Sequence, residues 1–384
     1  MRILHISKFG HPERGGIETF VRDLSAEQAR RGHEVAVLCH QARPWMPTDR
    51  TTADGVLAVR ARILCNLGFI PVSPSFPLHL RRLVRERRPE IIHLHLPNPA
   101  VLFSGLLPAH IPLVIHWHAD ADGLPGRLLR AAYPVYRLFE RKCLALARSV
   151  VATSPPYAAS SWALTPWRDK CVVVPLGLDP ARYPEDAKIA EDADLPEASA
   201  PLVLSVGRFT YYKGYATLVE AARRVPGARF VVVGDGPLHG AIRDMVREYG
   251  LAERVELSGE LADRDLRALQ RRADVACLPS VDRAEAFGMA QLEAMRYGVP
   301  LVSTAIPGSG VDWVNRDGVT GLVVPPGDAA ALAEALQRLI DHPRQRAAMG
   351  QAGRRRLEEE FTIVRVATAL DGVYRQAQRS PRSG

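Results

Sequence analysis

Two positive charges stand close together in a glycine-bounded stretch of the sequence, Gly207-Arg208-Phe-Thr-Tyr-Tyr-Lys213-Gly214. The stretch follows an apolar run and precedes a helix-like segment, so we expect a strand-to-helix loop. A guanidinium and an ammonium held in such a loop suit a pyrophosphate ligand. The alternative is an ordinary basic loop. It is not a Walker-type loop, because G-x-x-x-x-G-K-[ST] occurs nowhere in the chain, which disfavours an ATPase or kinase.

Two carboxylates, Glu285 and Glu293, flank a segment that we expect to be a loop followed by the start of a helix. Eight residues of continuous helix would separate them by about 12 Å, so each can reach a different part of one extended ligand. The free N–H groups around Gly288 and Met289 would lie beside the carboxylates. Taken alone, two glutamates at this spacing would be a coincidence more often than not. Together with the Arg208/Lys213 loop in the same half of the chain, it indicates a binding site.

A third candidate is Gly15-Gly16, just before a helix-like segment that begins near Thr19. Glycine lets the backbone approach a ligand closely, and the N-terminus of the following helix attracts anions. The alternative is a plain tight turn, since the G-x-G-x-x-G spacing is absent.

Short apolar runs that alternate with helix-like stretches must position these residues. This pattern is typical of βαβ units with a buried parallel sheet. It occurs in two series, before and after residue 200, so we expect an α/β protein with two Rossmann-like, doubly wound domains. The predicted strands are Ile3–Ile6, Glu34–Leu38, Ile91–Leu94, Leu113–His116, Ser149–Ala152 and Val172–Val174, then Leu202–Val206, Arg229–Val233, Val255–Leu257, Val275–Leu278, Leu301–Thr304 and Gly321–Val323.

A stretch rich in acidic residues, alanine and proline separates the two series, and we predict a linker over residues 183–200. The expected N-terminal domain spans residues 1–182 and the C-terminal domain residues 201–361. A helix over about residues 362–380 is expected to pack back on the first domain. Ligands of open α/β sheets lie at the carboxyl ends of the strands, so two facing sheets would place the active site in the cleft.

Composition and charge exclude several other classes. With 384 residues, 47% of them hydrophobic and 24% charged, the chain has globular composition. We expect neither a membrane span nor a signal peptide, and the five scattered cysteines predict neither a disulfide framework nor a zinc site. Residues 1–180 hold 23 basic and 14 acidic side chains, with a local peak at Arg81, Arg82, Arg85, Arg87 and Arg88. Such a patch suggests an anionic partner, or else a solvated helix face. No nucleic-acid-binding motif accompanies it, so nucleic acid is disfavoured.

Together these motifs resemble the retaining nucleotide-sugar glycosyltransferases of family GT4, which have the GT-B fold. The resemblance covers nearly the whole chain. It also includes Val174-Pro-Leu-Gly-Leu-Asp179, Gly234-Asp-Gly-Pro237 and Asp317-Gly-Val-Thr-Gly-Leu322. The family often has a glutamate shortly before the last of these segments, whereas this chain has Asp312 there.

The resemblance implies a role for each candidate residue. Arg208 and Lys213 would neutralise the donor diphosphate, with the Gly15-Gly16 backbone facing the same phosphates. Glu293 would bind the ribose hydroxyls. Glu285, with the backbone of Phe287, Gly288 and Met289, would hold the donor sugar. The loop that contains Gly259 and Leu261 would line the base. His118 stands where the family has a histidine near the sugar; His116 and Asp120 are weaker candidates, and we interpret His93 and His95 as ordinary strand residues.

The resemblance also implies the reaction: a hexose moves from a nucleotide-diphosphate sugar to an acceptor hydroxyl with retention of configuration. No metal and no cofactor beyond the donor are expected, because fixed cations stabilise the leaving diphosphate. The first domain would bind a saccharide or polyprenyl-diphosphate-linked acceptor on an anionic membrane surface. The expected location is therefore cytoplasmic and peripheral to the membrane. A similarity to bacterial polysaccharide mannosyl- and rhamnosyltransferases favours a GDP-sugar such as GDP-mannose over a UDP-sugar.

Two other functions remain open. A nucleotide-sugar 2-epimerase can share the GT-B fold and would need no acceptor, but it would require acid and base groups that the sequence does not identify. A non-catalytic protein that binds sugar nucleotides is the second alternative, against which the complete set of donor residues argues.

Overall fold

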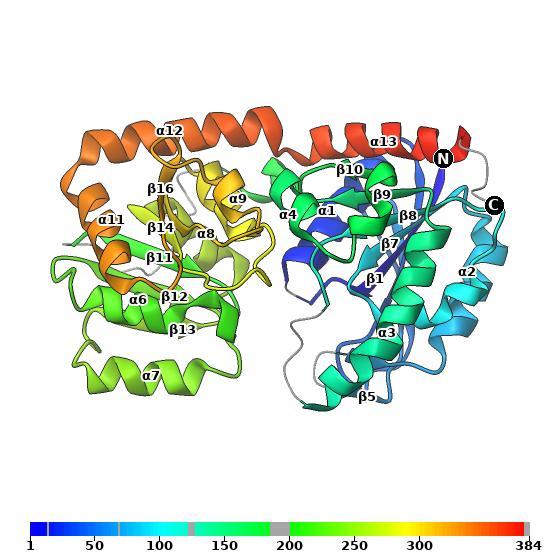
Figure 1. Ribbon diagram of the computed structural model, residues 1–384, viewed down its shortest axis with the longest axis horizontal. Helices are drawn as coiled ribbons and strands as arrows, with labels where there is room; N and C mark the ends of the chain where they lie inside the picture. The colour runs from blue at the N-terminus through cyan, green and yellow to red at the C-terminus, as the bar shows by residue number, and fades with distance from the viewer. Residues whose placement is uncertain (14, 68–69, 122–126, 185–199, 380–384) are drawn as a thin grey trace. The chain divides into compact units, whose positions relative to one another are not determined.

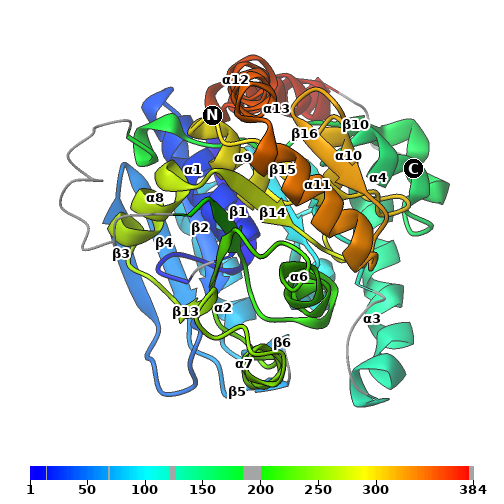
Figure 2. The same ribbon diagram turned by 90° about the vertical axis from the view of Figure 1, so that its left-hand side faces the viewer.

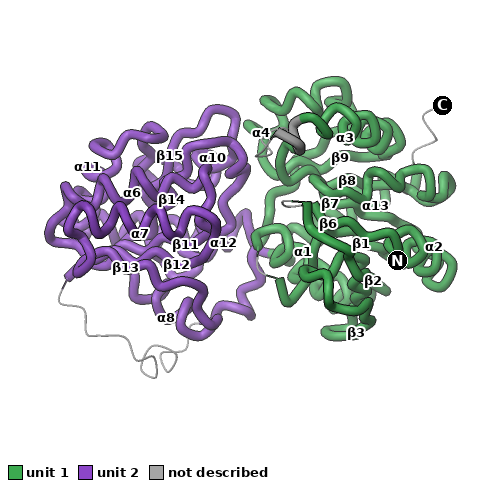
Figure 3. Tube along the Cα trace, turned by 90° about the horizontal axis from the view of Figure 1, so that it is seen from below, with its two compact units in different colours: residues 1–177, 363–384 green, residues 178–362 purple. Residues whose placement is uncertain are grey.

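The computed structural model of the chain describes residues 1–13, 15–67, 70–121, 127–184 and 200–379 (Figure 1). It divides into two compact units, coloured separately in Figure 3. Unit 1 contains Met1–Gly177 and Ile363–Gly384, and unit 2 contains Leu178–Thr362. Most of the predicted linker, residues 185–199, lies outside the described residues.

Unit 1 is built on an eight-stranded sheet with the strand order β10-β9-β8-β7-β1-β2-β4-β3. All neighbouring strands are parallel except β3 and β4. The inner strands are buried on both faces, which explains why they read as apolar runs in the sequence. Their bounds are β1 Arg2–Phe9, β2 Glu34–His40, β3 Asp49–Ala53, β4 Val56–Ala61, β7 Ile91–Leu96, β8 Leu113–Trp117, β9 Ser149–Ala152 and β10 Cys171–Val173; β5 Cys65–Leu67 and β6 Ile70–Val72 form a separate pair.

The β3–β4 hairpin is a feature that the sequence analysis missed. Its turn is Asp54-Gly55, and both residues have positive φ, at 52° and 76°. An Asp-Gly turn of this kind matches the right-handed twist of antiparallel strands and is a strong hairpin signal. The preceding strand is Thr-rich and exposed, so it lacks the apolar run on which the strand predictions relied.

Two layers of helices cover the unit 1 sheet. Helices α1 (Gly16–Arg30) and α13 (Ile363–Arg379) pack against each other and on the central strands, so the two ends of the chain meet in one layer (Figure 1). Helix α2 (Phe76–Arg87) packs on β2 and β4, and α3 (Arg127–Leu146) packs on the 3₁₀ segment Pro99–Leu106. The short helix α4 (Pro155–Ser160) lies beside β9 and β10.

Unit 2 is a six-stranded, all-parallel sheet with the order β13-β12-β11-β14-β15-β16. One face shares a hydrophobic core with α6, α7 and α11 (Figure 2), and α8 and α9 pack near β11, β14 and β15. The strands are β11 Leu202–Val206, β12 Arg229–Val233, β13 Val255–Gly259, β14 Val275–Leu278, β15 Leu301–Thr304 and β16 Gly321–Val324. The helices are α6 Tyr215–Ala222, α7 His239–Glu248, α8 Asp263–Arg272, α9 Met289–Arg296, α10 Val311–Val314, α11 Ala329–Asp341 and α12 Pro343–Glu360.

These two doubly wound sheets confirm the predicted α/β fold class, and each predicted strand corresponds to an observed one. The boundary of the first domain differs from the expected residue 182, because Leu178 already belongs to unit 2. Its N–H donates a hydrogen bond to the carbonyl oxygen of Phe361, and it pairs with Thr362. None of the helices in the described ranges is both long enough and apolar enough to span a bilayer.

Candidate active site

The strand order of unit 2 places two predicted motifs next to each other. The chain runs outward from β11 through β12 to β13, and outward in the other direction from β14 to β16, so β11 and β14 are neighbours at the point where the order reverses. Ligands of open α/β sheets bind at such a switch point. The loop after β11 carries Arg208 and Lys213, and the loop after β14 carries Glu285. The fold therefore brings these loops together.

Lys213 and Glu285 form a buried ion pair at this point, with 2.7 Å between Nζ and Oε2. Each residue is 8% exposed. Burial alone would lower the pKa of Lys213, but the adjacent Glu285 carboxylate raises it above its usual range, so the ammonium stays charged. Ser280 donates a second hydrogen bond to the same Glu285 oxygen, at 3.0 Å.

The loop after β14 is held in place through its main chain. Ser309 Oγ donates to the carbonyl oxygen of Glu285, and Gly310 N–H donates to that of Ala286. Gly288 caps α9 in the left-handed region, with φ 80°. A Cβ there would lie 2.7 Å from Leu278 Cδ2, so this turn requires glycine for both its backbone angle and its space.

Three consecutive N–H groups at the start of α9 lack a hydrogen-bond partner among the described residues: those of Phe287, Gly288 and Met289. The side chains of Phe287 and Met289 are buried in the core, so these residues offer only their main chain to a ligand. N–H groups without partners at a helix N-terminus bind anions and hydroxyl oxygens. These three residues follow shortly after Glu285, the carboxylate that pairs with Lys213.

Glu293, the second carboxylate of the motif, points from α9 toward α8 and the segment before the linker. Its Oε2 accepts a hydrogen bond from Gln270 Nε2 at 2.6 Å, and its Oε1 accepts one from Tyr183 OH at 3.1 Å. Burial raises the pKa of Glu293, while the hydrogen bonds from Tyr183 and Gln270 and the nearby charges of Arg182 and Lys213 oppose that rise.

The remaining predicted residues of unit 2 lie at the same edge of the sheet. Arg208 is exposed in the loop after β11. Gly259 ends β13 with φ 70°, and Leu261 follows it, half-buried. Because all six strands are parallel, the loops after β11, β13 and β14 share one edge.

In unit 1 the corresponding switch point lies between β1 and β7. Gly16 begins α1 after the loop that follows β1, and Gly15 caps the helix in an extended conformation. His118 immediately follows β8, where its N–H donates to the carbonyl oxygen of Leu96 on β7. Asp120 accepts hydrogen bonds from Trp117 Nε1 and Ser161 Oγ, so it holds the loop after β8 in place.

Five histidines from three neighbouring strands form a buried cluster beside His118: His5, His93, His95, His116 and His118, none more than 4% exposed. The strand register pairs His5 with His93 and His95 with His116. Burial lowers the pKa of His5 to about 4 and that of His118 to about 3, and it lowers the pKa of the other three as well. All five side chains are therefore neutral near pH 7, each with one N–H donor and one bare acceptor nitrogen.

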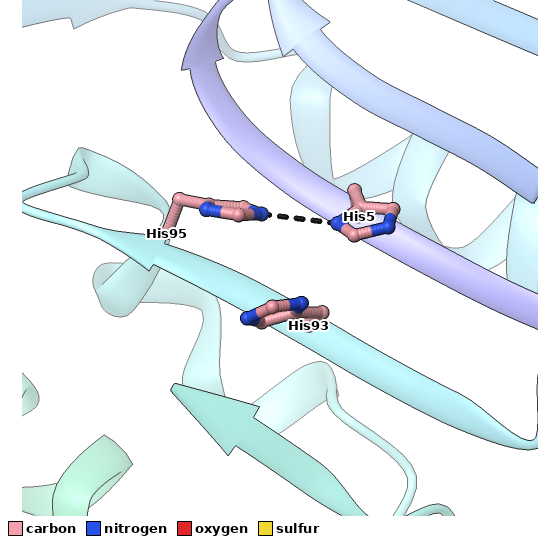
Figure 4. Close-up of side chains that lie close together, drawn as sticks. All are labelled: His5, His93 and His95. Carbon is pink, nitrogen blue, oxygen red and sulfur yellow. Dashed lines mark hydrogen bonds between the residues drawn. The ribbon is translucent and has the colours of Figure 1, made fainter. Parts of the chain in front are cut away.

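Two subsets of the cluster have the residue types and proximity of a metal site: His5 with His93 and His95 (Figure 4), and His95 with His116 and His118. The rings, however, are stacked. Those of His93 and His95 have centroids 4.5 Å apart at an interplanar angle of 29°, and those of His116 and His118 are 4.4 Å apart at 6°. Since the lone pair of an imidazole nitrogen lies in the plane of its ring, stacked rings do not direct their lone pairs at one ion. These rotamers suit hydrogen bonding rather than coordination.

The sequence analysis missed most of this cluster, since it interpreted His93 and His95 as ordinary strand residues. The available signal was the spacing of two residues within each strand, which places both histidines of a pair on one face of the sheet. The partners Gln28 and Tyr374 had no comparable signal, because α1 and α13 bring them to the cluster from distant parts of the sequence.

The five arginines of the predicted basic patch are all exposed, on α2 and at its C-cap. Arg82 and Arg50 pair with Glu86, at 2.6 and 2.9 Å. The remainder of the patch faces solvent as a cluster of positive charge.

Comparison with known proteins agrees with these observations. Residues 14–182 match the family model Glycosyltransferase Family 4, and residues 188–356 match Glycosyl transferases group 1. The chain is 33% identical to O-antigen chain mannosyltransferase C of Escherichia coli, over 97% of this chain and 98% of that protein. It is 32% identical to D-rhamnosyltransferase WbpZ of Pseudomonas aeruginosa, over 94% of this chain and 92% of that protein.

Among solved structures, sucrose-phosphate synthase from Thermosynechococcus elongatus matches with a TM-score of 0.81 and 26% sequence identity, covering 98% of each chain. The match extends over both units. The sequence relatives, the two family models and the paired doubly wound sheets all lead to one assignment: this chain belongs to glycosyltransferase family 4 and is a glycosyltransferase of the GT-B fold.

Proposed function

We propose that this enzyme transfers a hexose from a nucleotide-diphosphate sugar to a hydroxyl of a saccharide acceptor, with retention of configuration, in bacterial polysaccharide or lipopolysaccharide synthesis. The observation that carries the proposal is the buried Lys213–Glu285 pair at the switch point of unit 2, beside N–H groups without partners. A buried ammonium with a fixed position stabilises negative charge that develops on a leaving diphosphate.

In the proposed reaction the bond between C1 of the sugar and the diphosphate oxygen breaks as the bond from C1 to the acceptor oxygen forms. The acceptor proton passes to the leaving diphosphate. Lys213 and Arg208 neutralise that diphosphate, so no metal is required. Glu285 and the N–H groups of Phe287, Gly288 and Met289 bind the hydroxyls of the sugar, and the Gly15-Gly16 backbone contacts the phosphates.

Glu293 is the proposed ribose ligand. Its two oxygens already accept hydrogen bonds from Tyr183 and Gln270. An ionised carboxylate has about four acceptor positions, so two remain for a ribose diol. The loop of Gly259 and Leu261 would line the base. The mannosyl- and rhamnosyltransferase relatives favour a GDP-linked donor such as GDP-mannose.

The experiment is a transfer assay of Lys213→Met with a panel of GDP- and UDP-sugars and a saccharide acceptor. We expect kcat to fall by about 10²–10³-fold, because the substitution removes stabilisation that develops with the leaving-group charge. Arg224→Ala removes an exposed cation of the same unit and serves as the control. An unchanged kcat in Lys213→Met would reject the assigned role.

The products decide between this function and the alternatives. Retention predicts that the anomeric configuration of the new linkage, read by NMR, equals that of the donor. Release of a free, epimerised sugar nucleotide without acceptor would identify a 2-epimerase instead. Donor binding without turnover over the whole panel of acceptors would favour a sugar-nucleotide binding protein.

We further propose that the arginine cluster on α2 holds the enzyme on an anionic membrane surface at the cytoplasmic side, where a polyprenyl-diphosphate-linked acceptor would be found. Each well-placed arginine contributes about 1 kcal/mol to such binding. Substituting Arg81, Arg85 and Arg87 together by Ser should therefore weaken binding to vesicles that contain anionic lipid by about 100-fold. Equal sedimentation of both proteins with these vesicles would refute the proposal.

A further inference from the structure

A continuous line of hydrogen bonds runs from helix α1 through the histidine cluster to His118. His5 Nε2 lies 2.7 Å from Gln28 Oε1, and His5 Nδ1 lies 3.0 Å from His95 Nε2, the contact drawn in Figure 4. His95 Nδ1 then lies 3.0 Å from His118 Nε2. Gln28, His5 and His95 are each buried to 99% or more, so no solvent competes for these contacts.

The glutamine sets the direction of this line. Its Oε1 can only accept a hydrogen bond, so His5 must carry its proton on Nε2 and present a bare Nδ1. His95 must then donate from Nε2 and accept at Nδ1. His118 must in turn donate from Nε2, which leaves its Nδ1 bare. Three neutral rings are thus fixed in one tautomer by a residue on a different element.

A second branch joins the amide nitrogen of Gln28 to the rest of the cluster. Its Nε2 donates to Tyr374 OH at 3.0 Å, and that hydroxyl lies 2.7 Å from His93 Nδ1. Because the Tyr374 oxygen accepts a hydrogen bond from Gln28, the Tyr374 hydroxyl can donate its own proton in a hydrogen bond to His93 Nδ1. A reversed amide would reverse every donor and acceptor in the line and would place a proton on Nδ1 of His118.

The Nδ1 atom of His118 has no hydrogen-bond partner in the part of the chain that the structure describes, although it is buried. A bare, buried imidazole nitrogen accepts a hydrogen bond and cannot donate one. It therefore discriminates in favour of a ligand group that donates, such as a sugar hydroxyl, and against an ether or a carbonyl oxygen. His118 lies at the carboxyl end of β8, the edge of the sheet where ligands of such folds bind.

We propose that Gln28, His5 and His95 are positioning residues that hold His118 in its Nε2–H tautomer, so that its Nδ1 accepts a hydrogen bond from a hydroxyl of the transferred sugar. The identity of this ligand rests on the proposed function. The tautomer itself does not, because it follows from contacts within unit 1.

The experiment measures the tautomers directly in the full chain, without ligand, by ¹⁵N labelling of the histidine rings and long-range ¹H–¹⁵N correlation at pH 7.5. We expect the His118 signals of a protonated Nε2 and a bare Nδ1. In Gln28→Leu the line loses the group that sets its direction, so His118 should populate both tautomers and its two ¹⁵N shifts should move toward each other. A proton on Nδ1 in the wild type, or an unchanged tautomer in Gln28→Leu, would overturn the proposal.

Two further variants separate positioning from simple support of the fold. Gln28→Glu keeps an acceptor facing His5, so His118 should retain its Nε2–H tautomer; loss of that tautomer would contradict the assigned direction. Tyr374→Phe removes a buried hydroxyl of the same network but leaves the Gln28–His5–His95–His118 contacts, and the tautomer of His118 should stay unchanged. Should Gln28→Leu fail to fold, the wild-type and Gln28→Glu spectra still decide.

The activity assay then tests the ligand. In Gln28→Leu we expect kcat/KM for the donor to fall about tenfold, the value of one hydrogen bond to the sugar. Transfer by a wild-type enzyme whose His118 carries its proton on Nδ1 would overturn this inference alone. A protein that shows the expected tautomer but transfers no sugar would overturn the proposed function, and with it the ligand assigned to Nδ1.

Discussion

Lys213 and Glu285 form an ion pair at a buried position, where a single unpaired charge would be costly. Both side chains are buried, and removing one partner of such a pair leaves an uncompensated charge that costs about 3–5 kcal/mol. The pair has a consequence for binding. A diphosphate that binds the Lys213 ammonium must share it with Glu285, so the carboxylate competes with the ligand for the same charge. Glu285 therefore acts on the diphosphate as well as on the sugar in the proposed site.

Substituting Glu285→Gln tests this competition. The free ammonium of Lys213 should bind a nucleoside diphosphate more tightly, by about tenfold, while transfer falls because the sugar loses a carboxylate ligand. Isothermal titration with GDP and UDP gives the affinity, and the transfer assay gives kcat. The double variant Lys213→Met/Glu285→Gln is the control, since it should lose the gain in affinity. A weaker or unchanged diphosphate affinity in Glu285→Gln would show that the two groups do not compete.

Glu293 allows a similar test of the ribose contact. Glu293→Gln should raise KM for the donor by about 30-fold with little change in kcat, because hydrogen bonds to a charged group contribute about 2 kcal/mol and the ribose is remote from the reacting bond. The 2′-deoxynucleotide provides the control. It should bind the wild type more weakly than the ribonucleotide does, and the variant should hardly distinguish the two. If the variant still preferred the ribonucleotide by the full wild-type factor, Glu293 would not contact the 2′-hydroxyl.

At the scale of elements, α9 and α12 of unit 2 meet at two glycines. Gly298 ends the turn after α9 with φ 66°, and Gly350 lies within α12. A Cβ on Gly350 would overlap the main-chain carbonyl of Gly298. Main chain cannot yield as a flexible side chain does, so the close approach of α12 to this turn depends on glycine at position 350. The same approach supports α9, which carries Glu293 and begins at Gly288.

Gly350→Ala should therefore destabilise unit 2 by about 1–3 kcal/mol, the usual cost of overpacking a tight contact. Gly372→Ala is the matched control, because Gly372 lies in helix α13 with open space around it. That substitution should stabilise unit 1 by about 0.5–1 kcal/mol through the higher helix propensity of alanine. Urea unfolding of both variants gives the two free energies. Destabilisation by Gly372→Ala, or none by Gly350→Ala, would contradict the packing described here.

Across the whole molecule, the fold could be predicted because its determinants are local. Each buried parallel strand is a short apolar run, and the loops that carry Arg208, Lys213 and Glu285 follow such runs directly. The exposed hairpin strand Asp49–Ala53 was missed because it lacks that pattern. The boundary at residue 178 was missed because it depends on the pairing of Leu178 with Thr362, a contact between distant parts of the sequence.

The candidate site, like the fold, could be predicted from the sequence only in part. Motif spacing identified Lys213 and Glu285, but not that they would neutralise each other in a buried pair, which depends on how β11 and β14 lie side by side. The line of hydrogen-bonded histidines could not be predicted from the sequence for the same reason. Gln28, His5, His95 and His118 come from four separate segments of the chain. Only strand register and helix packing bring each contacting pair of atoms along the line within 3.0 Å.

Among the described residues, the buried histidines with lowered pKa values all lie in unit 1, and this predicts how the stability of the two units depends on pH. Burial lowers the pKa of His5 and His40 to about 4 and of His118 to about 3, and it lowers the pKa of His93, His95 and His116; all six lie in unit 1. In the unfolded chain a histidine has a pKa of about 6.5. Below that pH the unfolded chain binds protons that folded unit 1 excludes, so the stability is present above pH 6.5 and is lost as the pH falls toward 4.

Lowering the pH from 7 to 5.5 should reduce the free energy of unfolding of unit 1 by about 1 kcal/mol for each of these histidines. The sum approaches the full free energy of unfolding of a typical domain. Calorimetry at pH 7.5 and 5.5 should therefore show a transition of unit 1 that moves to much lower temperature in acid, while that of unit 2 moves little. Gly350→Ala identifies the unit 2 transition, since it should lower that one alone. If the unit 1 transition moved no further than that of unit 2, the histidines of unit 1 would be protonated in the folded state at pH 5.5, which is incompatible with a line of neutral rings leading to His118.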